Sequence, residues 1–270
     1  MSHEPSARRR RRLTQMAPIK FDKSLFVFAH PDDELALVIT LKRMREEGVE
    51  VHCVWVTDGR ITADPKVREE EAGKVMNLLG VPKDNLNFLR YEDGQSVYSM
   101  KEIIDALSKI IKKVNPHQIY VDAFEGGHMD HDTTHFTTVQ AVKRLDLNIP
   151  LYEFPQYNNY YKFIFKKYAT FIPDKEPIQC LPLTWSDLFL KLKILRMYSS
   201  QKNTIRELLI FFLFNIRKIK RGETFRKIPE ARDYLRPPHQ GELLYQILFK
   251  FSFSTFAAKV REEVEQQLDA

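Results

Sequence analysis

Cysteine is scarce in this sequence, which has only Cys53 and Cys180 among its 270 residues. Two isolated cysteines cannot make the disulfide framework of a small secreted domain or the paired thiolates of a zinc knuckle. Cys53 lies in a run of apolar residues typical of a strand, so we expect it to be an inert buried thiol. A cytoplasmic protein is therefore the default expectation.

Long hydrophobic runs are also missing. The apolar segment 205–216 is too short to span a bilayer. No apolar segment follows the five arginines of Arg8–Arg12, which excludes a twin-arginine or secretory signal. These arginines supply most of the net charge of +6, which would be 6 − 5 = +1 without them. We expect residues 1–20 to be a disordered basic tail that is solvated or attracted to an anionic surface, and we expect no nucleic acid partner.

No G-x-G-x-x-G motif follows the first predicted strand, which argues against a dinucleotide-binding module. The chain instead alternates strand-like and helix-like segments up to residue 155. This alternation predicts an α/β fold with a Rossmann-like, doubly wound and mainly parallel sheet. The expected strands are 24–29, 49–57, 86–91, 117–124 and 150–155, and the expected helices are 33–47, 66–79, 99–113 and 132–145.

The first predicted strand ends in a group of polar residues. His30, Pro31, Asp32, Asp33 and Glu34 follow its apolar run, and Pro31 suits the first turn of a helix. A single acidic residue here would more often be a helix cap than a ligand. Three acids and a histidine at one turn, however, repel and desolvate one another unless a cation lies among them. The stretch therefore indicates a metal or catalytic site.

A second polar motif follows the fourth predicted strand, where residues 128–131 read His128-Met129-Asp130-His131. In doubly wound sheets the winding often reverses between strands one and four, which then lie side by side. That arrangement would bring this motif next to His30, Asp32 and Asp33, although the two lie about a hundred residues apart in the chain.

The pair Ala-His-Pro-Asp-Asp-Glu and His-x-Asp-His resembles the signature of the PIG-L/LmbE family of zinc-dependent N-acetylglucosaminyl deacetylases. The resemblance covers about residues 24–200, and Met129 departs from it where proline is common. It implies a Zn²⁺ site, with Fe²⁺ as an alternative, held by His30, Asp33 and His131. Zinc hydrolases keep an open position for water beside three protein ligands.

The resemblance also assigns catalytic roles. Asp32 would be the general base that accepts a proton as metal-bound water attacks the amide. His128 would stabilise the tetrahedral intermediate or protonate the leaving amine. Asp130 would hold His128, or a ligand histidine, in the required tautomer.

Arg68 and Asp93 are the predicted substrate-binding residues. Arg68 is the best candidate for a cation facing a sugar or phosphate, because its guanidinium forks onto paired oxygens. The alternative for Arg68 is a surface ion pair with an acid one helical turn away. Glu71 and the stretch Tyr198-Ser199-Ser200-Gln201 also resemble family positions, with roles left open.

The predicted function is removal of an N-acetyl group from an N-acetylglucosamine-containing conjugate. Two alternatives remain: another amide or ester hydrolase of the same fold, and a non-catalytic protein that binds a sugar or a membrane surface. The aglycone and the oligomeric state are not specified by the sequence.

The last third of the chain has a different character. We expect residues 21–200 to form the deacetylase-like domain and residues 201–270 a helical C-terminal extension packed on it. Aromatic residues crowd 157–171, and residues 191–227 carry eleven Lys or Arg against two Glu. A basic segment that is rich in Leu and Phe can lie in a membrane interface, or it can pack on the sheet. We therefore expect peripheral association with the cytoplasmic membrane face and a lipid-linked substrate, with simple packing as the alternative.

Overall fold

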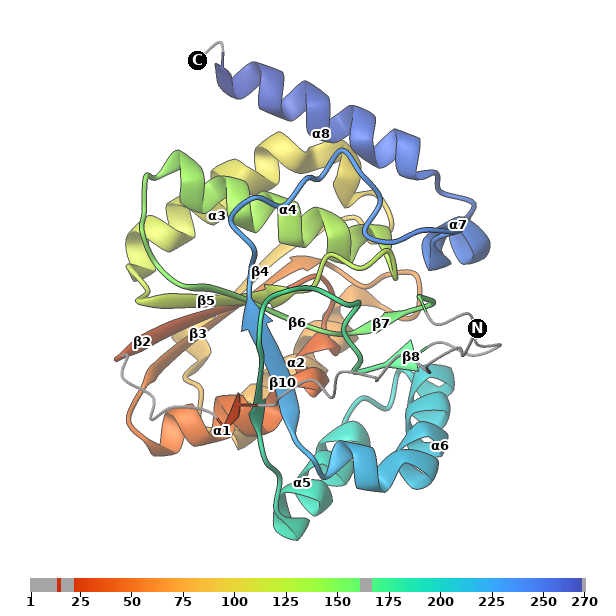
Figure 1. Ribbon diagram of the computed structural model, residues 1–270. Helices are drawn as coiled ribbons and strands as arrows, with labels where there is room; N and C mark the ends of the chain where they lie inside the picture. The colour runs from red at the N-terminus through yellow and green to blue at the C-terminus, as the bar shows by residue number, and fades with distance from the viewer. Residues whose placement is uncertain (1–13, 16–21, 161–166, 269–270) are drawn as a thin grey trace, which may run out of the picture.

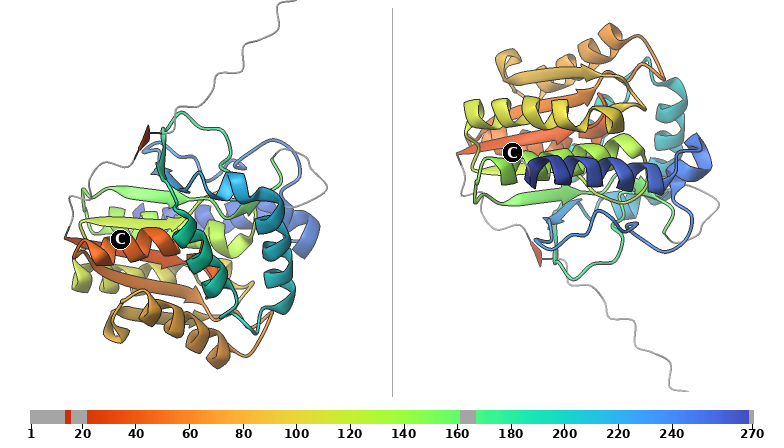
Figure 2. Two further views of the ribbon diagram at one scale, coloured as in Figure 1. Left: turned by 90° about the horizontal axis from the view of Figure 1, so that it is seen from below. Right: turned by 90° about the horizontal axis from the view of Figure 1, so that it is seen from above.

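The computed structural model describes residues 14–15, 22–160 and 167–268, and most of its strands join one twisted sheet with helices on both faces (Figures 1 and 2). The order in this sheet is β1-β9-β10-β6-β5-β2-β3-β4. The bounds are β1 Thr14–Gln15, β2 Lys23–Phe28, β3 Glu50–Thr57, β4 Leu86–Tyr91, β5 Gln118–Asp122, β6 Leu151–Phe154, β9 Ile178–Leu181 and β10 Glu223–Lys227. A separate antiparallel pair is formed by β7 (Tyr157–Asn158) and β8 (Lys167–Tyr168).

Helices cover the two faces in the way a doubly wound sheet requires. Figure 1 shows α3, α4 and α8 on one face and α1, α2 and α5 on the other. The bounds are η1 Asp33–Ala36, α1 Val38–Glu46, α2 Pro65–Leu78, η2 Lys83–Asn85, η3 Ser96–Ser99, α3 Met100–Val114, α4 Met129–Arg144, α5 Trp185–Leu195, α6 Lys202–Ile219, α7 Leu244–Phe249 and α8 Phe253–Leu268. The predicted fold class is confirmed.

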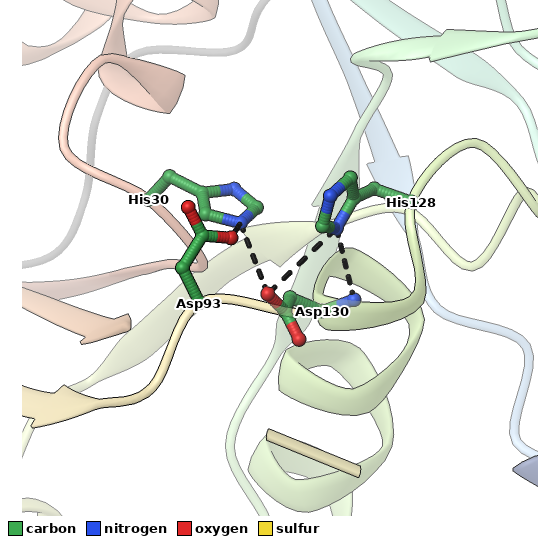
Figure 3. A group of neighbouring side chains, drawn as sticks. All are labelled: His30, Asp93, His128 and Asp130. Carbon is green, nitrogen blue, oxygen red and sulfur yellow. Dashed lines mark hydrogen bonds and ion pairs between the residues drawn. The ribbon is translucent and has the colours of Figure 1, made fainter. Parts of the chain in front are cut away.

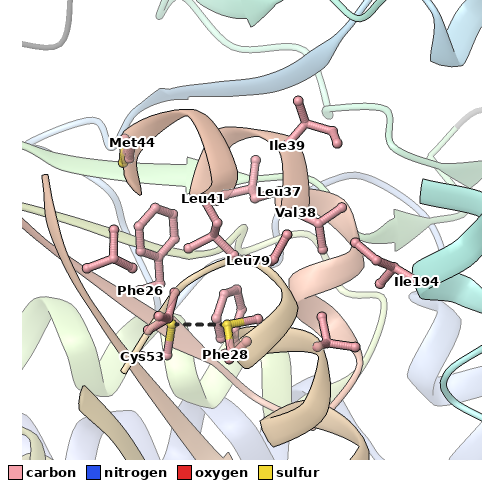
Figure 4. Packing of buried hydrophobic residues seen from close by; sticks show 14 of the residues in the cluster. Phe26, Phe28, Leu37, Val38, Ile39, Leu41, Met44, Cys53, Leu79 and Ile194 are labelled. Carbon is pink, nitrogen blue, oxygen red and sulfur yellow. Dashed lines mark hydrogen bonds between the residues drawn. The ribbon is translucent and has the colours of Figure 1, made fainter. Parts of the chain in front are cut away.

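The centre of the sheet is parallel and buried on both sides. Strand β2 pairs in parallel with β3 on one side and with β5 on the other. Alternate residues of β2 enter opposite layers, as the pleat of a strand requires. Phe26 and Phe28 pack against the α1–α2 layer (Figure 4), and Leu25 and Val27 pack against the α3–α4 layer. The first and fourth predicted strands, which are β2 and β5, therefore lie side by side as predicted.

Helix α4 differs from its prediction. It begins at Met129 rather than at residue 132, because His128 is the N-cap and its Nδ1 accepts a hydrogen bond from the amide of Asp130 at 3.2 Å. Histidine is not a usual N-cap residue, so no start signal marks this position in the sequence. The earlier start places His131 on the first turn of the helix. The predicted helix 33–47 is likewise divided, since Leu37 separates η1 from α1.

The C-terminal part contributes to the same sheet. Strand β10 runs antiparallel to both β6 and β9, and β9 pairs in parallel with β1. The N-terminal tail lies outside the described residues except for Thr14–Gln15, which form β1. The division of the chain at residue 200 remains a proposal. No helix among the described residues is long and apolar enough to cross a membrane.

Candidate metal and catalytic site

The site lies where the parallel strands of the sheet end. His30 follows β2, Asp93 follows β4, and His128 and His131 begin the helix that follows β5. The carboxyl ends of neighbouring parallel strands share one edge, so residues far apart in sequence meet there. Figure 3 shows His30, Asp93, His128 and Asp130 pointing toward one another at this edge.

Asp130 orients His30. The Nε2 atom of His30 lies 3.2 Å from Asp130 Oδ2 and 3.1 Å from Asp93 Oδ1. Asp130 Oδ2 also accepts a hydrogen bond from the Gly94 amide, and Asp130 Oδ1 accepts from the amide and the hydroxyl of Ser96. A carboxylate offers about four lone-pair positions. The Gly94 and Ser96 donors hold Asp130 beside His30, and Asp130 and Asp93 share the Nε2 side of that ring. His30, Asp93, His128 and Asp130 also form a buried group that could hold a metal ion.

The other ring nitrogen of His30, Nδ1, faces Asp33, which also contacts His131. His30 Nδ1 lies 3.3 Å from Asp33 Oδ2, and His131 Nε2 lies 3.2 Å from Asp33 Oδ1. One ligand atom from each of these three buried residues lies within 4.8 Å of the others. Two ligands at roughly 2.0–2.1 Å from one tetrahedral ion are about 3.3 Å apart, which matches the distances to Asp33. The predicted ligand set is thus brought together by the fold.

The electrostatics of this cluster favour positive charge. Burial alone would lower the pKa of His30, but Asp93, Asp130 and Asp33 outweigh it and raise that pKa well above its ordinary value. Burial acts in the same sense on His131, yet Asp33 raises its pKa to about 9. Carboxylates that hold extra protons on imidazoles also suit a divalent cation.

One further observation bears on whether the residues fit a metal. His131 Nδ1 is buried and has no hydrogen-bond partner among the described residues. This atom lies on the side of the ring away from Nε2, which faces Asp33, so the fit to a metal rests on the donor set and not on this nitrogen. The donor types and spacing of His30, Asp33 and His131 therefore fit a divalent metal ion.

Asp32 points away from its neighbour Asp33. Both of its carboxylate oxygens lie 3.3 Å from the terminal nitrogens of Arg68. Its φ of 126° is in the region that favours glycine, so the backbone here is strained. Burial raises the pKa of Asp32, and Arg68 opposes that shift. Gly59 permits the fork, because a Cβ at that position would lie 2.6 Å from Arg68 Nε.

Glu34 holds the backbone of Asp32, and sequence reasoning did not assign it this part. Its carboxylate is fully buried and accepts hydrogen bonds from the Asp32 amide at 2.9 Å and from Trp55 Nε1 at 3.0 Å. The hydroxyl of Tyr198 donates to its other oxygen. Burial raises the pKa of Glu34 to about 7 despite these donors. The available sequence signals were the place of Glu34 in the first motif and of Tyr198 in the stretch 198–201 that resembles family positions.

His128 presents its Nε2 atom as a donor. Because its Nδ1 accepts the Asp130 amide, a neutral ring carries its proton on Nε2. Burial lowers the pKa of His128 to about 3, which keeps the ring neutral near pH 7. The Asp130 carboxylate lies 3.8 Å from His128, farther than its 3.2 Å from His30, so of the two predicted partners His30 is the nearer.

A cavity of about 500 Å³ opens above these residues. His30, Asp32, Asp33, Arg68, Asp93, His128 and His131 all line it. Beyond them the cavity continues between η1 and α6, where its walls are largely apolar and include Leu183, Leu195, Leu208, Phe211 and Phe212. Arg68 is not the surface ion pair considered as its alternative, because it is buried and directed at Asp32. Asp93 lies against His30, and its substrate contact remains a prediction.

Two supporting groups were outside the predicted site. Asp122, the last residue of β5, accepts the Ala29 amide at 2.8 Å and Gln156 Nε2 at 2.9 Å, which fixes the strand end beside His30. An acid at the end of a buried strand was the signal that could have identified it. Glu71 accepts from the hydroxyls of Ser199 and Ser200, which ties the Tyr198-Ser199-Ser200 stretch to α2.

Residues 25–142 match the PIG-L family model, described as GlcNAc-PI de-N-acetylase. Among curated protein sequences the comparison found no match.

Several solved structures are similar. N,N'-diacetylchitobiose deacetylase from Pyrococcus horikoshii is 26% identical, with a TM-score of 0.56 over 78% of this chain and 85% of that one. The zinc-inhibited form of a teicoplanin deacetylase is 17% identical, with a TM-score of 0.60 over 78% and 99%. A 4-carboxy-2-hydroxymuconate hydratase from Pseudomonas putida is 13% identical, with a TM-score of 0.54 over 78% and 98%. The last of these indicates that the shared fold does not by itself specify the reaction.

Proposed function

We propose that the chain, whose residues 25–142 match the PIG-L family model, is a metal-dependent hydrolase that removes the N-acetyl group from an N-acetylglucosamine-containing conjugate. One observation carries the proposal. The two polar motifs converge on two overlapping buried His/Asp groups that share His30, and a strained aspartate that belongs to neither group lines the same cavity.

His30, Asp33 and His131 would hold the metal, with zinc as the first candidate and iron as the second. A divalent ion bound there would polarise the amide carbonyl and lower the pKa of water. Asp130 and Asp93 would keep His30 in the tautomer that leaves Nδ1 directed at Asp33.

Asp32 is the proposed general base. As a water molecule adds to the carbonyl carbon of the amide, Asp32 takes the proton that the water loses. Arg68 holds the carboxylate from one side, and Glu34 holds its backbone amide from the other. Both contacts fix the direction in which Asp32 faces the cavity, which favours proton transfer at a defined position.

His128 is the proposed donor to the developing oxyanion. Its neutral ring donates Nε2–H, which would stabilise negative charge on the carbonyl oxygen of the tetrahedral intermediate. The C–N bond then breaks, and the proton held by Asp32 passes to the amine nitrogen. The products are acetate and the free amino sugar. A low pKa of His128 supports the oxyanion role over the role of acid.

The substrate class is proposed from the relatives and from the cavity. The chitobiose deacetylase is named for an N-acetylated sugar, and we propose an N-acetylated amino sugar here. Arg68 and Asp93 line the end of the cavity where the sugar would lie. The apolar walls near Leu195 and Phe212 suit an apolar aglycone, so we propose a lipid-linked conjugate.

The two alternatives differ in what they require of the site. Another amide or ester hydrolase would use the same residues on a different acyl group or sugar. A non-catalytic binding protein would need neither a base nor an oxyanion donor, so the cavity position of Asp32 and His128 argues against it.

Acetate release tests the proposal. Purified protein, loaded with Zn²⁺ or with Fe²⁺, is incubated with a panel of N-acetylglucosaminides that differ in aglycone. We expect acetate from at least one of them, and none after removal of the metal. Release of a different acyl group would favour the first alternative, and sugar binding without acetate release would favour the second.

A further inference from the structure

Helix α6 is apolar on two sides, and the described residues cover only one of them. Its inner side packs on the core through Phe212 and lines the cavity through Leu208 and Phe211. On the opposite side Ile210, Leu213 and Phe214 are 51%, 72% and 85% exposed. A helix that is apolar all round is normally buried, so the outer side of α6 is an unpartnered surface.

These three residues form a short stripe at helical spacing. Exposed Arg206 lies one turn before Ile210, and exposed Arg217 lies one turn after Leu213. We call this set of five residues the α6 outer face. Figure 1 shows α6 at the periphery of the molecule, far from α3 and α4.

Most charged residues around this face are basic, although exposed Glu207 lies beside Arg206 on the same helix and accepts a hydrogen bond from the Tyr168 hydroxyl. Three of the eleven basic residues of 191–227 are occupied internally: Lys191 pairs with Glu223, Arg226 with Glu153, and Lys218 donates to the carbonyl of Tyr168. By contrast, no acid of the described residues lies within ion-pair distance of Arg206 or Arg217. Further exposed cations on α5, on α6 and on the segments that follow these helices are Lys193, Arg196, Lys202 and Arg221.

The end of α6 continues this pattern toward α5. Lys220 Nζ lies 4.9 Å from the ring centroid of Trp185, which is itself exposed. Tryptophan and lysine are characteristic of membrane–water interfaces, where the ring lies at headgroup depth and the ammonium reaches phosphate.

We propose that the α6 outer face docks on an anionic lipid bilayer, with Ile210, Leu213 and Phe214 entering the boundary between headgroups and acyl chains. Arg206 and Arg217 would meet lipid phosphates at the two ends of the stripe. A protein partner of the same shape would need complementary acids, whereas a bilayer supplies both the apolar layer and the negative charge. This docking stands independently of the deacetylase activity, because none of the five residues lines the cavity.

Vesicle cosedimentation of the full-length protein tests this proposal. We expect binding to phosphatidylcholine vesicles that contain phosphatidylserine, and much weaker binding to phosphatidylcholine alone. Leu213→Ser with Phe214→Ser should lower the partition coefficient by at least about tenfold, since two large apolar side chains no longer leave water. Leu235→Ser is the matched control, because Leu235 is exposed and precedes an arginine but lies outside α6. Its binding should equal that of the wild type.

The charge contribution has its own variant. Arg206→Glu with Arg217→Glu should weaken binding to the phosphatidylserine vesicles by about tenfold or more and leave binding to phosphatidylcholine unchanged.

Four results would overturn the proposal. The first is no vesicle binding by the full-length protein at low salt, and the second is equal binding by the Leu213→Ser/Phe214→Ser variant. The third is binding that is lost on deletion of residues 1–17 but kept by that variant, which would credit the arginine tail. The fourth is a dimer in sedimentation velocity that the variant converts to a monomer, which would show that a second copy covers the face.

Discussion

Replacing Asp32 by asparagine separates catalysis from metal binding. Asparagine has the same shape and keeps one oxygen, but it cannot accept a proton from water. The carboxylate of Asp32 contacts Arg68. The proposed histidine ligands, His30 and His131, instead contact Asp33, the third proposed ligand. We therefore expect Asp32→Asn to bind the metal as the wild type does and to lose nearly all turnover.

The expected size of the loss follows from the proposed role. A general base contributes roughly a hundred- to ten-thousand-fold in rate. At about 1.36 kcal/mol for each factor of ten, this corresponds to roughly 3–5 kcal/mol of transition-state stabilisation. The cost to the fold is smaller. One of the two contacts with buried Arg68 is lost, which costs about 1–3 kcal/mol of a stability near 5–15 kcal/mol. Asparagine also tolerates the positive φ better than most residues.

Three measurements on one preparation make the test sharp: turnover by acetate release, metal content by elemental analysis, and the midpoint of thermal unfolding. Asp64→Asn is the matched control, since Asp64 caps α2 through a hydrogen bond from the Lys66 amide and asparagine caps a helix equally well. Near-wild-type turnover of Asp32→Asn would refute the role of base. Loss of metal from that variant would show that the two adjacent aspartates have been assigned in the wrong order.

Three further predictions follow from the same structure. His131→Ala should lose the bound metal in elemental analysis, and full occupancy would refute its assignment as a ligand. Gly59→Ala should displace Arg68, because the new Cβ would lie 2.6 Å from its Nε in a backbone of positive φ; kcat should fall more than KM rises, and unchanged kcat would refute the orienting role of Arg68. His135→Gln tests pH dependence: burial lowers the pKa of His135 to about 4 from its ordinary value near 6.5. As the pH falls from 6.5 to 4, His135 is therefore protonated in the unfolded state before the folded state, which favours unfolding. The free energy of unfolding of the wild type, measured in urea, should fall by up to about 3 kcal/mol more than that of the variant. An equal loss of unfolding free energy in both proteins would refute the lowered pKa of His135.

The fold was predictable where the chain alternates regularly. Up to residue 155 each apolar strand is followed by an amphipathic helix, and the observed strands β2 to β6 lie within two residues of the predicted bounds. Beyond that point the pattern gave no strand, yet β9 and β10 extend the sheet. Strand β10 pairs antiparallel with both neighbours, so its place depends on partners 42 to 75 residues away rather than on a local period.

The sequence predicted that His30, Asp33 and His131 meet at one place, and it predicted less well which residues support them. The two motifs identified each residue of the cluster because both follow buried strands that lie side by side. The hydrogen bonds that hold the cluster join residues distant in sequence: Tyr198 lies 164 positions from Glu34, and Asp130 lies 100 positions from His30. Asp130 had two possible partners in the sequence, and only the distances of 3.2 Å and 3.8 Å distinguish them.

The backbone of Asp32 gives a reason to favour hydrolysis over mere binding. A non-glycine residue at φ 126° stores about 1–3 kcal/mol of strain, and such a conformation persists only when its surroundings over-determine it. Here Glu34 accepts the amide of Asp32, and Arg68 holds its carboxylate. Metal binding does not require this arrangement, because the two histidine ligands, His30 and His131, contact Asp33 and not Asp32. A carboxylate that is strained, oriented from two sides and directed into the cavity is what proton transfer beside a polarised amide demands.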